Sequence, residues 1–170
     1  KVFTTAMSDV EADIRGKSDD KLLDIARRIK KEYESNQKVS LQYLTRLYGI
    51  KEINVVNDDG FITNSTDADV INSYDMNSKA QSKEFMDTMK VKSYFVQAYS
   101  PRGKDDAQWR KYAAVKLTNG GFIQVGYDAE QFHERLNEFV IDVTKNRHVG
   151  TRGFIAVCDE NLNLITDNEY

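Results

Sequence analysis

The chain has 170 residues, a formal net charge of −3 and an apolar share of 40%. These values suit one folded domain, or one domain plus part of another, and they exclude a disordered chain. The charges are interspersed, so no basic face exists for nucleic-acid binding. A single cysteine, Cys158, excludes an intrachain disulfide and a cysteine-based zinc site. No apolar run reaches the roughly 18 residues of a membrane span, and Lys1 in place of an initiating methionine suggests an excised fragment.

The first 50 residues are expected to form a helical region. Apolar residues recur at helical spacing up to about residue 33, which predicts an amphipathic helix. Gly16-Lys17-Ser18 interrupts this pattern, and Ser18 has the chemistry to cap a restarted helix. One long helix and two shorter ones therefore both fit. A short helix is predicted over residues 41–48, capped by Ser40 and ended by Gly49, with Leu44 and Leu47 facing the core.

A hairpin and a third helix come next. Two short strands are predicted within residues 52–65, around the turn Asn57-Asp58-Asp59-Gly60. We interpret its acids as turn residues rather than a calcium site, because their spacing does not match an EF-hand loop. Ser78 and Gln81 fit a capping box that opens a helix over residues 78–89. Its apolar side is suited to core packing, and could also roof a ligand pocket; it comprises Phe85, Met86 and Met89.

Residues 93–128 are expected to hold three consecutive strands, Ser93–Tyr99, Trp109–Leu117 and Phe122–Tyr127, with a polar loop between the first two. Three antiparallel strands in a row form a meander with one buried face. The other face, rich in Tyr, Gln and Arg, could close over a ligand. Because side chains alternate along a strand, Tyr94 and Tyr99 cannot both line one pocket if the first strand is regular.

The last part of the chain contains a helix and a second hairpin pattern. Asp128 and Gln131 form a capping pattern, and the helix that follows has an apolar stripe of Phe132, Leu136, Phe139, Val140 and Val143. Residues 150–168 predict two strands around an acidic turn, the same layout as residues 52–65. This repeat suggests that a second domain begins near Gly150. The alternative is that any two hairpins look alike at this length.

This order of elements resembles the extracytoplasmic Cache domains, which are PAS-like sensor modules of bacterial and archaeal transmembrane receptors. The resemblance implies an α+β fold, with a PAS-like antiparallel sheet flanked by a long N-terminal helix and a C-terminal exit helix. It also implies a sensor module over residues 51–147 and the start of a truncated, membrane-proximal second module over residues 148–170. The residues that carry it are Ile53–Thr63, Tyr94–Tyr99, Tyr112–Leu117, Phe122–Phe132 and 148–155.

By the same resemblance, the chain is expected to be the outer part of a membrane-anchored receptor that binds an amino acid, an organic acid or an amine. The output module, absent here, would be a histidine kinase, a chemoreceptor signalling domain, a nucleotide cyclase or a serine phosphatase. A homodimer through the first helix is compatible with its apolar stripe. We expect no cofactor, no metal and no catalysis, because the sequence has no zinc-binding histidine motif, serine elbow or phosphate loop.

The candidate ligand-binding residues lie on the meander and its loop: Tyr94, Gln97, Tyr99, Arg102, Trp109, Arg110, Tyr112 and Asp128. In amino-acid-binding Cache domains, an Arg and aromatic residues hold the ligand's carboxylate, and an Asp at the position of Asp128 holds its ammonium. The family's Arg-x-Trp order is missing here, which counts against an amino acid. Asp128 also has an explanation as a helix cap, and Arg102 as a solvated loop residue. The competing hypotheses are a ligandless structural, interaction or dimerisation module and an intracellular PAS-like enzyme regulator.

Overall fold

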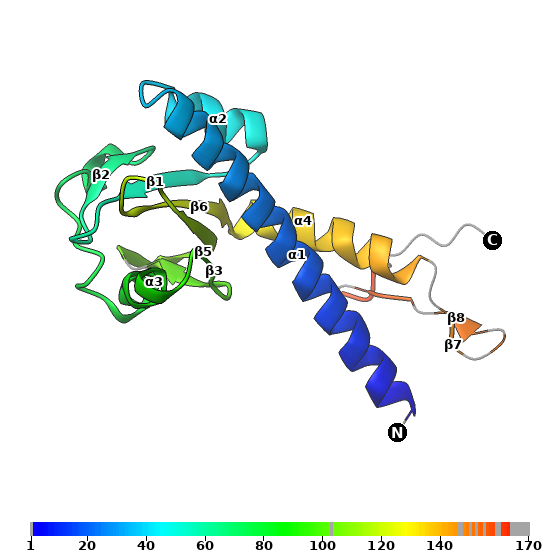
Figure 1. Cartoon of the computed structure of the whole chain (residues 1–170). Coiled ribbons are helices and arrows are strands. Elements are labelled where there is room, and N and C mark those ends of the chain that lie inside the picture. Colours follow the sequence, from blue (N-terminus) through cyan, green and yellow to red (C-terminus); the bar gives the residue numbers. More distant parts are fainter. Residues whose placement is uncertain are drawn as a thin grey trace. The chain divides into compact units, whose positions relative to one another are not determined.

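The computed structural model describes residues 2–102, 104–145, 148–149, 151, 153–154, 156–158 and 161–163. The chain divides into two compact units. The larger unit, residues 21–132, contains a six-stranded antiparallel sheet. The smaller unit comprises residues 1–20 and 133–170. Figure 1 labels the α-helices of both units and their strands other than β4.

Helices surround the sheet of the larger unit. They are α1 (Val2–Ser35), which continues from the smaller unit, α2 (Leu41–Tyr48), the short 3-10 helix η1 (Ala68–Val70), α3 (Ala80–Val91) and the first turn of α4 (Ala129–Thr144). The first helix runs unbroken through Gly16, so the one-helix alternative is correct. As predicted, the Ser40 side chain accepts a hydrogen bond from Tyr43 N at 3.2 Å. Gly49 ends α2 with a φ of 62°, which costs glycine little.

The strands pair in the order β2-β1-β6-β5-β3, and β4 also pairs with β5. Their bounds are β1 (Glu52–Val56), β2 (Ile62–Ser65), β3 (Tyr94–Val96), β4 (Ser100–Arg102), β5 (Asp105–Lys116) and β6 (Phe122–Asp128). The predicted meander is confirmed, as is the α+β architecture with an antiparallel sheet, a long N-terminal helix and a C-terminal helix. The predicted polar loop is wrong, because β4 and the start of β5 pair as a hairpin through Pro101 and Trp109.

Alternation along the strands gives the sheet two different faces. One face presents Ile53, Val55, Ile123 and Val125, which pack against a cluster of residues from α1 and α2 that includes Leu22, Ile29 and Leu44. The other face presents Val56, Ala114 and Phe122, which pack against Phe85, Met86 and Met89 of α3. In Figure 1, α1 and α2 lie on one side of the sheet and α3 on the other. Burial of each large apolar side chain contributes about 1.5–3 kcal/mol.

Two local predictions fail in the helices. Leu47 is 55% exposed while Leu44 is 1% exposed, because the three-residue step from Leu44 carries Leu47 past the buried edge of the stripe. Helix α3 begins at Ala80 after an extended Lys79, with no side-chain cap. The Ser78 hydroxyl instead donates to Asp75 O at 2.6 Å. At the start of α4 the capping box is confirmed: Asp128 Oδ1 accepts from Gln131 N at 2.9 Å, and Gln131 Oε1 accepts from Asp128 N at 3.3 Å.

The smaller unit contains the first part of α1, the part of α4 from His133 onward, and a hairpin of β7 (His148–Val149) and β8 (Gly153–Phe154). Val140 and Val143 of the predicted α4 stripe are buried, and Lys17 forms an ion pair with Asp142. Most of the predicted strand after residues 159–161 lies outside the described residues, so the truncated second module stays a prediction.

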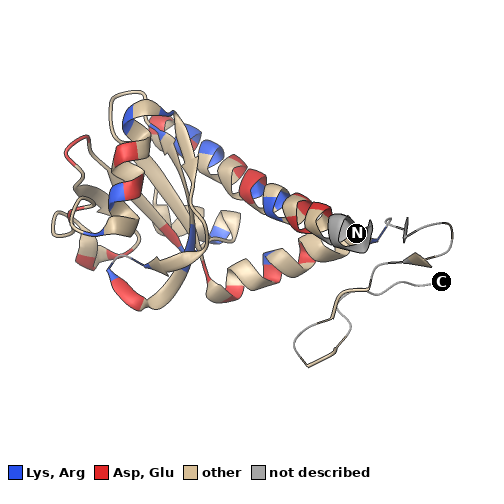
Figure 2. Ribbon diagram, turned by 90° about the horizontal axis from the view of Figure 1, so that it is seen from below, with Lys and Arg blue, Asp and Glu red and all other residues tan. Residues whose placement is uncertain are grey.

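Charges of both signs alternate along the helices, as Figure 2 shows for α1. On that helix the pairs Arg15–Glu11 and Arg28–Asp24 join residues four apart, an arrangement that stabilises a solvated helix surface. Within the part of the chain that the structure describes, no helix is long and apolar enough to cross a membrane.

Candidate ligand pocket

A set of buried polar side chains crosses the α3 face of the sheet. Asn54 on β1 lies opposite Gln124 on β6, and its Nδ2 donates to Gln124 Oε1 at 3.0 Å and to Glu52 Oε1 at 2.9 Å. The Tyr112 hydroxyl donates to Glu52 Oε2 at 3.0 Å. Gly126 makes room for this tyrosine, because a Cβ at residue 126 would lie 2.5 Å from the Tyr112 ring. Buried polar groups are costly unless they are hydrogen-bonded, and these groups satisfy one another.

Charged side chains extend this set toward the edge of the sheet. Arg102 Nη2 lies 2.9 Å from Glu52 Oε1 and 2.7 Å from Asp67 Oδ2. Lys104 Nζ also contacts Asp67 Oδ2, at 3.1 Å, and Arg110 Nε lies 3.5 Å from Glu52 Oε2. The prediction that Arg102 is a solvated loop residue is wrong, since only 8% of its side chain is exposed. The β4–β5 hairpin folds it back over β1, where Glu52 provides the opposite charge.

The pKa values of these groups follow from burial and from their partners. Burial alone would raise the pKa of Asp67, but hydrogen bonds from Arg102 and Lys104 outweigh it and lower the pKa to about 2. Burial raises the pKa of Tyr112, and the neighbouring Glu52 carboxylate raises it further. For Arg102, burial favours the neutral form, but the charge of Glu52 and the hydrogen bond to Asp67 raise its pKa overall. The guanidinium and the Asp67 carboxylate are therefore both ionised at neutral pH.

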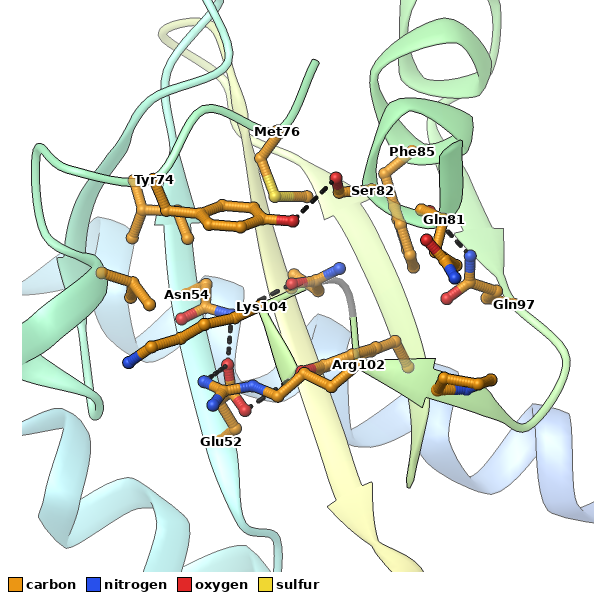
Figure 3. A pocket seen from close by; sticks show the side chains of 15 residues that line it. Glu52, Asn54, Tyr74, Met76, Gln81, Ser82, Phe85, Gln97, Arg102 and Lys104 are labelled. Atoms are coloured by element: carbon orange, nitrogen blue, oxygen red, sulfur yellow. Dashed lines mark hydrogen bonds and ion pairs between the residues drawn. The ribbon is translucent and has the colours of Figure 1, made fainter. Parts of the chain in front are cut away.

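These polar groups form one side of a pocket between the sheet and α3, shown in Figure 3. The apolar part of its lining comprises Ile62, Val70, Met76 and Phe85. The pocket holds a cavity of about 30 Å³, which is room for one or two water molecules. The Tyr74 and Ser82 hydroxyls are 3.1 Å apart across it. A larger guest therefore requires the lining side chains to move apart.

Three of the candidate residues named from the sequence line this pocket: Gln97, Arg102 and Tyr112. Gln97 Nε2 donates to Gln81 O at 2.8 Å and to Glu84 Oε2 at 2.7 Å, which fastens β3's end to α3. Tyr94 lies away from the pocket, because strand alternation turns it to the face covered by α1. There the Arg27 guanidinium carbon lies 5.4 Å from the centre of the Tyr94 ring.

The other four candidates do not line the pocket. Tyr99 stacks on Phe132 with 4.6 Å between ring centres, and it contacts the Trp109 ring at 5.2 Å. Burial raises the pKa of Tyr99. Arg110 is paired with Asp128 in the β5–β6 register and reaches the pocket only through Glu52. Asp128 caps α4 and lies 3.5 Å from Lys51 Nζ.

Sequence reasoning missed several of the lining residues. Glu52, Asn54 and Gln124 are polar residues at positions of one parity in strands whose other residues are mostly apolar. Polar residues that alternate with apolar ones along a buried strand were a usable signal, because residues two apart in a strand face the same side of the sheet. Tyr74 and Lys104 gave no such signal, since they come from irregular segments that only the tertiary fold brings to the pocket.

No family model matches the chain, and no curated protein matches it. Among solved structures, the ligand-binding domain of a Campylobacter jejuni chemoreceptor in complex with 4-methylisoleucine aligns with 95% of this chain and 65% of its own, at 12% identity and a TM-score of 0.49. An extracellular ligand-binding receptor from Desulfohalobium retbaense aligns with 80% of this chain and 25% of its own, at 13% identity and a TM-score of 0.46. The chain thus spans less than two thirds of either neighbour.

Proposed function

We propose that this chain is the extracytoplasmic, non-catalytic sensing domain of a membrane-anchored signal-transduction protein, and that its ligand binds between the sheet and α3. The observation that carries this proposal is the pocket itself. Its lining combines buried polar and charged groups with apolar side chains, and small-molecule sites use this combination for affinity and orientation.

The chemistry of the lining supports an amino acid, an organic acid or an amine as the ligand. Arg102 and Lys104 can receive a carboxylate, and Glu52 can receive an ammonium. The side chains of Val70, Met76 and Phe85 leave an apolar surface for a short hydrocarbon group. Because the charged groups already pair with one another and with Asp67, a ligand binds by replacing part of these interactions.

Binding would act as a population shift between closed and open arrangements of the pocket. Helix α4 follows β6 directly, and its capping residue Asp128 is the register partner of Arg110. Arg110 in turn contacts Glu52 in the pocket. A change at Glu52 would therefore reach the start of the exit helix through two contacts. An output module of the kinase, chemoreceptor, cyclase or phosphatase kind, and a homodimer, belong to the same proposal, as does a second module that begins near residue 148.

One observation favours a second candidate, a ligandless structural or interaction module. The cavity is small, about 30 Å³, and Glu52, Asn54 and Gln124 satisfy one another without a guest. In that case, the buried polar groups only fix the packing of α3 on the sheet.

A thermal-shift screen of amino acids, organic acids and amines separates the two candidates. A ligand at about 100 times its Kd stabilises the folded state by about 2.7 kcal/mol, a readily measured rise in melting temperature. We expect one chemical class to give this rise in the wild-type chain, and Lys104→Gln and Ser82→Ala to reduce it. Lys92→Gln, outside the pocket lining, is the matched control. If no compound of the three classes raises the melting temperature, the ligandless module is the correct description.

A further inference from the structure

A second cavity lies on the α3 face of the sheet, away from the polar residues of the first. Its volume is about 280 Å³, far larger than the cavity of the first pocket. It lies where the end of α3 meets the β1–β2 turn and the start of β6. Its lining comprises Asn57, Asp58, Met86, Met89, Lys90, Lys116, Gly121 and Phe122.

The apolar part of this lining is buried and well supported. Met86, Met89 and Phe122 all belong to the hydrophobic cluster under α3. Phe122 lies against Phe85 with nearly parallel rings, 6.3 Å between their centres. Methionine side chains are flexible and polarisable, so they adapt to the shape of an apolar guest.

The polar part of the lining carries more positive than negative charge. Lys90 and Lys116 contribute two ammonium groups, whereas Asp58 contributes the single carboxylate. That carboxylate already has a structural role, because its Oδ1 accepts a hydrogen bond from Gly121 N at 2.7 Å. Lys90 lies 3.8 Å from Asp87 on the exposed side of α3, which is too long for a strong charged hydrogen bond. Lys116 is exposed, so both ammonium groups can meet a ligand.

We propose that this cavity is a second ligand site, which takes an amphipathic carboxylate: a short hydrocarbon chain or ring on the methionine and phenylalanine surface, with its carboxylate between Lys90 and Lys116. A cationic ligand would meet two like charges, and a purely polar anion would leave the apolar surface unfilled. The volume is just below the range of about 300–1,000 Å³ typical of sites for drug-sized ligands, so the guest is a small acid of the size of octanoate.

This site is independent of the proposed sensing pocket. The two cavities lie along different parts of α3, since Gln81, Ser82 and Phe85 line the first while Met86, Met89 and Lys90 line the second. The proposal holds whether or not the first pocket binds a ligand.

Methyl NMR of the four methionines tests the proposal and locates the ligand in one measurement. Met86 and Met89 line the second cavity, whereas Met76 lines the first. With the whole chain labelled at its methionine methyl groups and titrated with octanoate, we expect saturable shifts at Met86 and Met89 that exceed those at Met76. Octylamine, of the same chain length and opposite charge, should give no saturable shift at Met86 and Met89.

Charge variants provide the second test. Lys90→Gln and Lys116→Gln should each weaken octanoate binding about tenfold, the effect of losing a charge-assisted hydrogen bond. Lys92→Gln and the first-pocket variant Lys104→Gln should bind octanoate as the wild type does. The proposal is wrong if octanoate causes no saturable shift at Met86 and Met89, if octylamine shifts these two methyl groups as strongly, or if Lys104→Gln weakens binding more than Lys116→Gln does. Self-association that depends on Lys90 and Lys116 would instead assign this surface to a second copy of the chain.

Discussion

The two faces of the sheet come from the same strands but have different chemistry. On β1 and β6, the face under α1 and α2 carries only apolar or aromatic residues: Ile53, Val55, Ile123, Val125 and Tyr127. The face under α3 carries Glu52, Asn54 and Gln124 at the intervening positions, all of them buried. Burial is similar on both faces, and only the chemistry of the buried groups differs.

This contrast separates what holds the fold from what is available for binding. Apolar packing under α1 gives stability in proportion to buried area. Buried ion pairs such as Glu52–Arg102 are not needed for stability, because apolar residues of similar volume are often as good or better at such positions. The α3 face keeps buried polar residues beside a cavity although they are costly to bury, so it is suited to ligand recognition. Substitutions on each face can separate stability from recognition.

The largest expected effect is on the apolar face. Ile123 is fully buried there, so Ile123→Ala should remove about 3–4 kcal/mol from the free energy of unfolding through lost burial and the cavity left behind. Urea unfolding monitored by circular dichroism measures this. The rise in melting temperature caused by a pocket ligand should stay unchanged. Loss of that rise in a variant that is still folded would contradict the division of roles between the faces.

The next effect is on the polar face. Glu52→Gln leaves Arg102 and Arg110 without their buried counter-charge, which should cost about 3 kcal/mol and also abolish the response to a pocket ligand. The double change Glu52→Gln with Arg102→Met should cost less than the sum of the two single changes, because the second removes a charge that the first has left with only its Asp67 partner. Strictly additive unfolding free energies would show that the pair is not coupled.

Local sequence patterns correctly predicted the strands, the faces of the sheet and the start of α4. Alternation in residues 52–65 and 93–127 predicted the strands and placed Tyr94 and Gln97 on opposite faces. The sequence around Asp128 predicted its capping box, because such signals depend on neighbours three or four residues away. These elements form where local preference and tertiary packing agree.

The parts that failed depend on contacts distant in sequence. The Arg102 side chain is buried only because Glu52, fifty positions earlier, and Asp67 provide partners. No periodicity of residues 100–106 contains that information. The same applies to Asp128 as a candidate ligand contact: its local capping role is confirmed, while the pocket lies elsewhere on the sheet. Whether any of the candidate residues contacts a ligand stays a prediction.

A third prediction uses pH to weaken the polar face without changing its shape. The pKa of Asp67 is lowered from 3.8 to about 2 in the folded chain, so folding favours the ionised carboxylate. Its stabilising contribution is complete well above pH 3.8, and it is lost as the pH falls toward 2. We expect the ionised carboxylate to contribute about 1 kcal/mol to the free energy of unfolding, since part of it is exposed and screened by water. Asp67→Asn should lower the stability at pH 7 by that amount and flatten the acid limb of the stability profile. An unchanged limb would mean that Arg102 and Lys104 do not hold this carboxylate in solution.

The smallest effect is expected on the outside of α2, where the sequence pattern was misassigned. Leu47 is 55% exposed, so Leu47→Ala should change the free energy of unfolding by less than about 0.5 kcal/mol. Leu44 is the matched residue on the same helix, and because it is 1% exposed in the cluster under the apolar face, Leu44→Ala should approach the cost of Ile123→Ala. Urea unfolding of both variants measures the difference directly. Equal costs would mean that α2 turns Leu47 toward the core in solution. The apolar cluster under α1 and α2 would then include Leu47 as well as Leu44.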